Sequence, residues 1–248
     1  MLLKKWEQLP YEMQLVEVRK YYNILKKKQV SLAFKRVFDV ILSSIMLIAL
    51  SPVFLVLTIA IKIDSKGPVF YRQERVTQYN QKFYIFKFRT MVQNADKGSL
   101  VTVSNDARIT KIGRIIRKFR LDEISQLINV LNGDMTFVGT RPEVPKYIER
   151  YTPEMMATLL LPAGVTSLTS IYYKDEDKLL DGTDNPDKVY TDKVLPGKMY
   201  YNLEGIKAFG FFSDIKIMFM TVLAVCGKEF VPKRAKSKET RENYAVKM

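Results

Sequence analysis

Two adjacent carboxylates, Asp122 and Glu123, stand directly behind a strongly basic stretch of the chain. That stretch includes Arg117, Lys118 and Arg120, and positive charge of this kind lowers the pKa of a neighbouring carboxyl group. An aspartate that stays ionised can bind Mg²⁺ through oxygen or attack phosphorus as a nucleophile. The structural alternative is that both acids occupy the first turn of a helix over 121–131 and stabilise its dipole.

A second group of residues, behind that helix, could bind an anion. The segment GDMTFVGTRPE (133–143) combines glycine turns with Arg141. An arginine beside exposed backbone is suited to clamping phosphate, and a plain loop with a surface arginine is the alternative. Lys87 and Arg89 alternate with aromatic residues at strand spacing and could point at the same anion. Their alternative role is to protect an edge strand by charge.

Composition excludes several other kinds of site. The 248 residues contain 40 Lys and Arg against 26 Asp and Glu, a net charge of +14, with no histidine and one cysteine, Cys226. These counts exclude a Ser-His-Asp triad, a histidine-containing zinc site and an internal disulfide. Neither a Walker loop nor a dinucleotide glycine fingerprint is present. The charge predicts an anionic partner, either nucleic acid, phospholipid headgroups or a phosphorylated substrate.

A long apolar segment precedes all of these residues. Val40 to Ile61 contains 22 residues without a charge, which as a straight helix would be roughly 33 Å long and could span a bilayer. Ser51-Pro52 lies at its middle, where proline predicts a bend, and Ser51 could cover the freed backbone groups. Lysine and arginine lie on both flanks, which favours a re-entrant helix that enters and leaves by one face. An ordinary spanning helix is the alternative.

The elements that must position the charged residues follow from local patterns. Residues 1–35 predict one or two helices at the headgroup level, and 67–91 predict a β-hairpin that turns at Tyr79-Asn80. From Arg108 the apolar residues fall on one face of a basic amphipathic helix, either on a membrane or over a protein core. Asn132-Gly133 ends the next helix.

Three further segments carry no motif for chemistry. The acidic stretch 174–192 lacks the spacing of an EF-hand and predicts a solvated loop. Residues 211–226 are mostly apolar but carry two charges, which predicts an amphipathic or buried helix. The last residues predict a disordered basic tail.

Taken together, six ordered motifs resemble the bacterial sugar transferase family, the monotopic phosphoglycosyl transferases. They are KRVFD (35–39), the apolar run with Ser51-Pro52, GPVFYRQER (67–75), KFRTM (87–91), RLDEISQLINVLNGDM (120–135) and FVGTRPE (137–143). The resemblance covers about 34–225. It implies transfer of a sugar 1-phosphate from a nucleotide sugar, usually a UDP-sugar, to a polyprenyl phosphate such as undecaprenyl phosphate, with release of UMP.

The resemblance also implies roles for individual residues. Asp122 matches the nucleophile that forms a phosphosugar intermediate, with Mg²⁺ on the diphosphate and Asp122 as its protein ligand. Glu123 matches the partner acid that helps to deprotonate the polyprenyl phosphate. The cationic positions around the phosphates fall on Lys87, Arg117 and Arg141, with Arg89 as a further candidate. Ser51 and Pro52 match the hinge of a re-entrant helix.

The chain departs from the family pattern at three places. Arg120 and Ile124-Ser125 flank the acidic pair where the family commonly has serine and leucine-proline. Thr140 replaces a proline before Arg141, and Gly164 to Ser167 reads GVTS where the family has GITG. The acidic stretch that follows is also unusual. These departures leave the sugar specificity open.

The expected fold is α+β and mostly helical, with a re-entrant N-terminal membrane helix hairpin, interfacial amphipathic helices and a small β-hairpin. We expect an interfacial helical extension (1–34), a membrane helix (35–63), a cytosolic catalytic domain (64–228) and a basic disordered tail (229–248). The expected location is the bacterial inner membrane, with the catalytic domain facing the cytoplasm. Expected partners are a nucleotide sugar, polyprenyl phosphate and anionic inner-membrane lipids, but no nucleic acid, and a homodimer is compatible. The alternative is a non-catalytic scaffold of a polysaccharide assembly complex.

Overall fold

The computed structural model describes residues 3–93, 95, 106–173, 183 and 185–230. Its helices and strands are η1 (Trp6–Gln8), η2 (Tyr11–Met13), α1 (Val16–Lys26), α2 (Gln29–Ala49), α3 (Ser51–Asp64), β1 (Phe70–Val76), η3 (Gln78–Asn80), β2 (Lys82–Phe88), α4 (Lys111–Lys118), η5 (Leu121–Gln126), α5 (Leu127–Asn132), β3 (Met135–Val138), α6 (Pro145–Ile148), η6 (Met155–Leu160), β4 (Ala163–Thr166), α7 (Leu168–Tyr172), α9 (Pro186–Val189), η7 (Tyr190–Val194), α10 (Leu195–Lys207) and α11 (Phe211–Val225). This is the mostly helical α+β fold that the sequence predicts. The basic tail from 231 lies outside the described residues.

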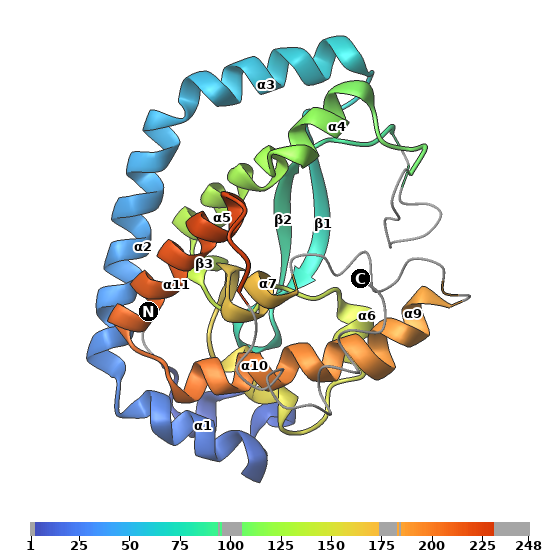
Figure 1. The fold of residues 1–248 in the computed structure, drawn as a ribbon. Helices are drawn as coiled ribbons and strands as arrows, with labels where there is room; N and C mark the ends of the chain where they lie inside the picture. The colour runs from blue at the N-terminus through green and yellow to red at the C-terminus, as the bar shows by residue number, and fades with distance from the viewer. Residues whose placement is uncertain (1–2, 94, 96–105, 174–182, 184, 231–248) are drawn as a thin grey trace.

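The apolar segment forms two helices, α2 and α3, which meet at a bend of 59° (Figure 1). In the described part of the chain only this bent pair, and no single helix, has the length and apolarity to cross a bilayer. Pro52 has no N–H for the carbonyl of Ile48 four residues earlier, and the Ser51 hydroxyl donates to that oxygen at 2.8 Å instead. The predicted break and the predicted covering role of Ser51 are therefore confirmed.

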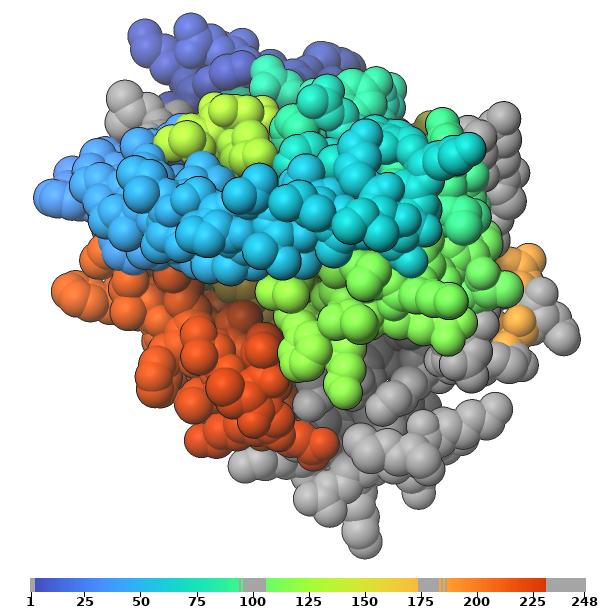
Figure 2. All heavy atoms as spheres, turned by 90° about the horizontal axis from the view of Figure 1, so that it is seen from above, coloured from blue at the N-terminus to red at the C-terminus, as the bar shows by residue number. Residues whose placement is uncertain are grey.

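The outer faces of α2, α3 and α11 carry unpaired apolar side chains. Those with more than half of their surface exposed are Val30, Phe34, Val37, Ile41, Ile45, Ile48, Leu55, Val56, Ile59, Ile63, Phe212, Phe219, Val222 and Val225. Figure 2 shows α2 and α3 running across one face of the molecule with α11 beside them. Exposed apolar surface of this extent marks a membrane or protein contact, which supports membrane association.

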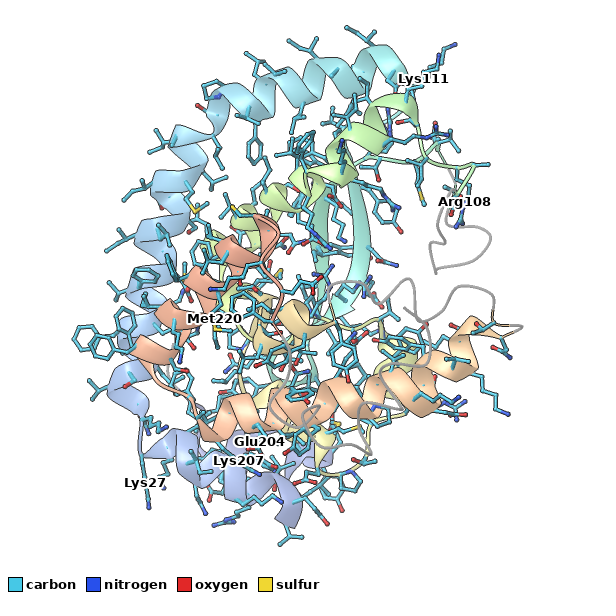
Figure 3. The ribbon with its side chains drawn as sticks, viewed as in Figure 1. Lys27, Arg108, Lys111, Glu204, Lys207 and Met220 are labelled. Atoms are coloured by element: carbon cyan, nitrogen blue, oxygen red, sulfur yellow. The ribbon has the colours of Figure 1, made fainter. Side chains whose placement is uncertain are left out.

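The KRVFD motif fastens α2 to the rest of the chain. The Lys35 ammonium and the Asp214 carboxylate of α11 form a buried ion pair at 2.6 Å. Asp39, also buried, accepts hydrogen bonds from the Thr136 hydroxyl at 2.6 Å and the Phe137 N–H at 3.3 Å. Lys35 therefore does not contribute to the basic flank that the sequence suggests. Lys27, before α2, and Lys111, beside the end of α3, do lie at opposite ends of the bent pair (Figure 3).

The N-terminal segment packs on the protein rather than presenting its apolar face outward. Its buried side chains, which join those of η6 and α10 in one core, are Leu3, Leu9, Met13, Val18, Tyr21, Tyr22 and Leu25. These apolar side chains contact the protein core, so they are not available to contact lipid as those of an interfacial helix would be. The position of this segment relative to a bilayer stays a prediction.

The hairpin and a short parallel pair form the two sheets of the described chain. β1 and β2 pair antiparallel, from Phe70 with Phe88 to Val76 with Lys82, so the predicted hairpin and its turn are confirmed. β3 and β4 pair parallel. In the acidic stretch, 174–182 and 184 lie outside the described residues, while its end forms α9 and the start of η7 instead of a loop.

Candidate active site

The acidic pair lies where α4 ends and η5 begins. Arg120 lies between α4 and η5 and adopts a left-handed conformation with φ of 52°, which costs free energy in a residue with a side chain. This turn puts Asp122 and Glu123 in the first turn of η5, as the sequence predicts.

Hydrogen bonds to the free edge of β2 hold η5 and α5 against the hairpin. The Asn129 side chain accepts from the Phe86 N–H at 2.9 Å and donates to the Tyr84 carbonyl at 2.9 Å. The Ser125 hydroxyl donates to the Phe86 carbonyl at 3.0 Å. The two side chains satisfy the strand edge as a further strand would, and they bring Glu123 beside Lys87.

Glu123 lies between two cations. Its carboxylate accepts from Arg141 at 2.6 and 3.5 Å through the two terminal nitrogens, and Lys87 Nζ lies 3.6 Å away. Burial would raise the pKa of Glu123, but the charges of Arg141 and Lys87 outweigh burial and lower it. Glu123 is therefore ionised over the whole physiological range, and it orients both cations.

Asp122 behaves in the opposite way. Burial raises the pKa of its carboxyl group above 3.8, with Lys87 lowering it and Glu123 raising it further. The sequence predicts a lowered pKa from neighbouring cations, and this prediction is wrong because burial outweighs them. Adjacent carboxylates whose environments separate their pKa values are typical of sites that divide two chemical roles.

Arg117 and Lys87 complete the cationic surroundings. Arg117 Nε donates to the Thr90 hydroxyl at 3.0 Å, and its charge acts on Asp122. Burial lowers the pKa of Lys87, while Glu123 opposes the shift. The structure thus gathers Asp122, Glu123, Lys87, Arg117 and Arg141 from three parts of the chain, as a site for anionic phosphate requires.

Arg89 lies elsewhere. It is buried, and its Nη2 donates to the Ser65 carbonyl at 2.6 Å and the Ser65 hydroxyl at 2.9 Å. These contacts put the guanidinium at the C-terminal end of α3 rather than beside Glu123. Alternation along a strand would put residues 87 and 89 on one face. β2 ends at Phe88, so Arg89 lies beyond the strand and does not follow that pattern.

The loop that carries Arg141 is fixed by the β3–β4 pair. The Gly139 N–H donates to the Thr166 carbonyl at 3.0 Å, and the Gly164 N–H donates to the Thr140 carbonyl at 2.8 Å. A Cβ on Gly164 would lie 2.2 Å from the Gly139 nitrogen. Only glycine allows this close approach of two backbones. Gly164, the first residue of the GVTS segment, therefore helps to fix the backbone before Arg141 without contacting the acidic pair itself.

Two further residues, Arg75 and Glu143, each end one of the quoted motifs and support the Arg141 loop. Arg75 Nη1 donates to the Pro142 carbonyl at 3.1 Å. The buried Glu143 accepts from the Tyr190 hydroxyl at 2.6 Å and from Lys198 Nζ at 3.2 Å. Lys198 and Tyr190 are more than 45 positions from Glu143 in sequence, so only the tertiary structure reveals this cluster.

The donor set fits a metal that arrives with its substrate. In the described ranges no three Asp, Glu, His or Cys side chains could hold an ion by themselves. Mg²⁺ commonly binds through one or two carboxylates together with substrate phosphates. Glu123 is committed to Arg141 and Lys87, which leaves Asp122 as the carboxylate for such an ion.

Comparison with known proteins agrees with the motifs. Residues 30–228 match the family described as "Bacterial sugar transferase". The UDP-glucose:undecaprenyl-phosphate glucose-1-phosphate transferase of Klebsiella pneumoniae is 35% identical over 83% of this chain and 42% of its own length. The undecaprenyl-phosphate galactose phosphotransferase of Salmonella typhimurium is 32% identical over 88% of this chain and 45% of its own length.

A shorter relative is covered more fully. The exopolysaccharide production protein ExoY of Rhizobium meliloti is 30% identical over 77% of this chain and 85% of its own length. The chain thus spans less than half of the two longer relatives and most of ExoY. Motifs, fold and comparisons agree: the chain belongs to the bacterial sugar transferase family.

Proposed function

We propose that this protein transfers a sugar 1-phosphate from a UDP-sugar to undecaprenyl phosphate and releases UMP. The observation that carries the proposal is the half-buried Asp122, whose carboxyl group feels the charges of Lys87 and Arg117, beside the ion pair of Glu123 with Arg141, in a chain of this family. The names of the relatives support the same two substrates.

In the first step the Asp122 carboxylate attacks the β-phosphorus of the UDP-sugar. A bond forms between aspartate oxygen and phosphorus, the bond from phosphorus to the bridging oxygen breaks, and UMP leaves with that oxygen. The cations offset the repulsion between aspartate and diphosphate. Mg²⁺, held by Asp122 and the diphosphate, would supply further neutralisation of charge.

In the second step an oxygen of undecaprenyl phosphate attacks the same phosphorus. The aspartyl bond breaks, which regenerates the Asp122 carboxylate and forms undecaprenyl diphosphate sugar. Because ion pairs lower the pKa of Glu123, it is a weak base in the free protein and acts first by orienting Arg141 and Lys87. Its assistance in deprotonating the lipid phosphate requires those ion pairs to loosen when the substrates bind.

The acceptor requires the site to lie at the cytoplasmic face of the inner membrane. The bend at Ser51-Pro52, the exposed apolar faces of α2 and α3, and cations at both ends of the pair support a re-entrant hairpin. Cysteines at positions 30 and 66, in a Cys226→Ser background, should both react from the cytoplasmic side of sealed vesicles. Labelling from opposite sides would establish a broken span instead.

The deciding assay is UMP release by the purified protein with Mg²⁺, undecaprenyl phosphate and a panel of UDP-sugars. Release that depends on both metal and lipid supports the transferase, and the productive sugar supplies the specificity. The alternative is a non-catalytic scaffold, which predicts no release with any sugar while membrane association persists.

A further inference from the structure

Apart from the candidate active site, a basic cavity lies between the N-terminal segment and α2. Its volume is about 360 Å³. Five separate parts of the chain line it, through Lys4, Arg36, Gln78, Tyr79, Gln81, Gly133 and Pro162. Two of these side chains are cationic and none is acidic, so the lining has a net positive charge.

Neither cation is neutralised within the described part of the chain. Lys4 and Arg36 form no salt bridge with a described carboxylate, whereas Lys35, beside Arg36, is paired with Asp214. Arg36 donates one N–H to the Val130 carbonyl at 2.6 Å and one to the Leu131 carbonyl at 2.9 Å. A guanidinium has five N–H groups, so Arg36 retains donors for a further acceptor.

The cavity is built before any ligand arrives. Tyr79 in its wall has φ of 57°, an outlier for a bulky residue. The Tyr79 hydroxyl accepts from the Lys4 N–H at 2.9 Å, and the Tyr22 hydroxyl donates to the Lys4 carbonyl at 3.0 Å. These bonds fix the backbone at Lys4, whose Nζ lies 4.7 Å from the centre of the Tyr79 ring.

Gly133 forms the side of the cavity next to Arg36. It ends α5 with φ of 95°, and a Cβ there would lie 3.3 Å from Arg36 Nη2. Glycine thus provides both the left-handed helix end and the space for the guanidinium. The acidic pair lies at the other end of η5 and α5, roughly 15 Å of helix away, so the cavity is a separate site.

We propose that this cavity binds a phosphate-bearing anion through Lys4 and Arg36. Arginine and lysine with neighbouring amides recognise phosphate oxygens. Arg36 lies between Phe34 and Val37, which are 64% and 56% exposed, so the cavity is close to the level at which α2 enters its apolar stretch. The phosphate can therefore come from a phospholipid headgroup or from a soluble phosphate ester.

The test is a thermal-unfolding titration of the full chain in neutral detergent at constant ionic strength. One arm adds phosphatidylglycerol and the other adds glycerol 3-phosphate. Lys4→Glu reverses a charge in the cavity, and Lys5→Glu makes the same change at the next exposed residue, which does not line it. Phosphate bound near Asp122 affects both variants equally, so their difference isolates the cavity.

We expect saturable stabilisation of the wild type and of Lys5→Glu, and an apparent affinity weakened roughly tenfold in Lys4→Glu. Arg36→Lys, which keeps the charge, should weaken binding less than Arg36→Gln. Saturation by the lipid alone identifies a headgroup site, and saturation by the soluble ester identifies a soluble ligand. Equal losses in Lys4→Glu and Lys5→Glu, or no saturation in the wild type, would overturn the proposal.

Discussion

Two glutamates, Glu123 in η5 and Glu143 directly after Arg141-Pro142, form ion pairs that differ in their exposure to solvent. Glu123 pairs with Arg141 and Lys87, whose side chains are 36% and 22% exposed. Glu143 pairs with Lys198, and both of these side chains are only 6% exposed. Under the proposed function the first cluster exchanges its internal ion pairs for a phosphate, and its side chains reach solvent as this requires. The Glu143–Lys198 pair is shut off from solvent and can only support the loop.

The buried Glu143–Lys198 pair helps to hold the loop that carries Arg141 in place. The Glu143 carbonyl accepts from the Val76 N–H at 3.0 Å, while its carboxylate reaches Tyr190 and Lys198. Burial would raise the pKa of Glu143, but Lys198, Tyr190 and Arg75 outweigh it and lower the pKa. Glu143 thus joins the hairpin to the Arg141 loop through its backbone carbonyl, and its ionised side chain connects this loop to η7 and the start of α10.

The largest expected effect on activity comes from Asp122, next to the Glu123 cluster. Asp122→Asn should reduce UMP release by roughly 10³-fold or more, because the amide cannot attack phosphorus. Membrane association and the melting temperature should persist. Asp187→Asn, at a half-exposed carboxylate bonded to Lys146 and Tyr147, is the matched control. Near-normal release by Asp122→Asn would refute the assignment of the nucleophile.

The two glutamates should differ in stability. Glu143→Ala leaves the Lys198 charge buried without its partner, and we expect a loss of about 3–5 kcal/mol in the free energy of unfolding. Glu123→Ala leaves two cations that reach water, and should cost about 1 kcal/mol or less. Denaturant titration in detergent measures both. Equal losses would mean that the two clusters do not differ as described.

A smaller loss of activity is expected when Arg141 keeps its charge but loses its planar guanidinium group. Arg141→Lys retains the charge but loses the two-nitrogen contact with Glu123, so kcat/KM should fall by roughly tenfold to a hundredfold. Arg150→Lys, at an exposed arginine outside both clusters, should leave it unchanged. A fall in Arg141→Lys no larger than in the control would show that only its charge matters.

The smallest effect is a shift in pH dependence. Asp122 must be ionised to attack, so activity falls as pH drops through its pKa, which lies above 3.8. Lys87 lowers that pKa, so Lys87→Met should move the acid limb of kcat/KM to higher pH. Glu123 raises that pKa, so Glu123→Gln should move the limb to lower pH. Shifts in the same direction would contradict the electrostatic description of the site.

Much of this could be predicted from sequence because the signals are local. The break at Ser51-Pro52, the hairpin turn at Tyr79-Asn80 and the helix end at Gly133 each depend on residues within one turn. The acidic pair at the start of η5 follows from the same kind of pattern. Family motifs then suggested roles for Asp122 and Arg141, which periodicity alone left open and which the assays above test.

What only the tertiary structure decided depends on burial and on partners far apart in sequence. It partly buried Asp122 and so raised the pKa that neighbouring cations were expected to lower, and it turned Arg89 toward the end of α3. It also packed the N-terminal segment on η6 and paired Lys35 with Asp214 across 179 positions. A sequence determines helix periods and turns because they involve neighbouring residues. Desolvation and long-range ion pairs are decided only when distant segments meet, because the free energy of a charge depends on what surrounds it.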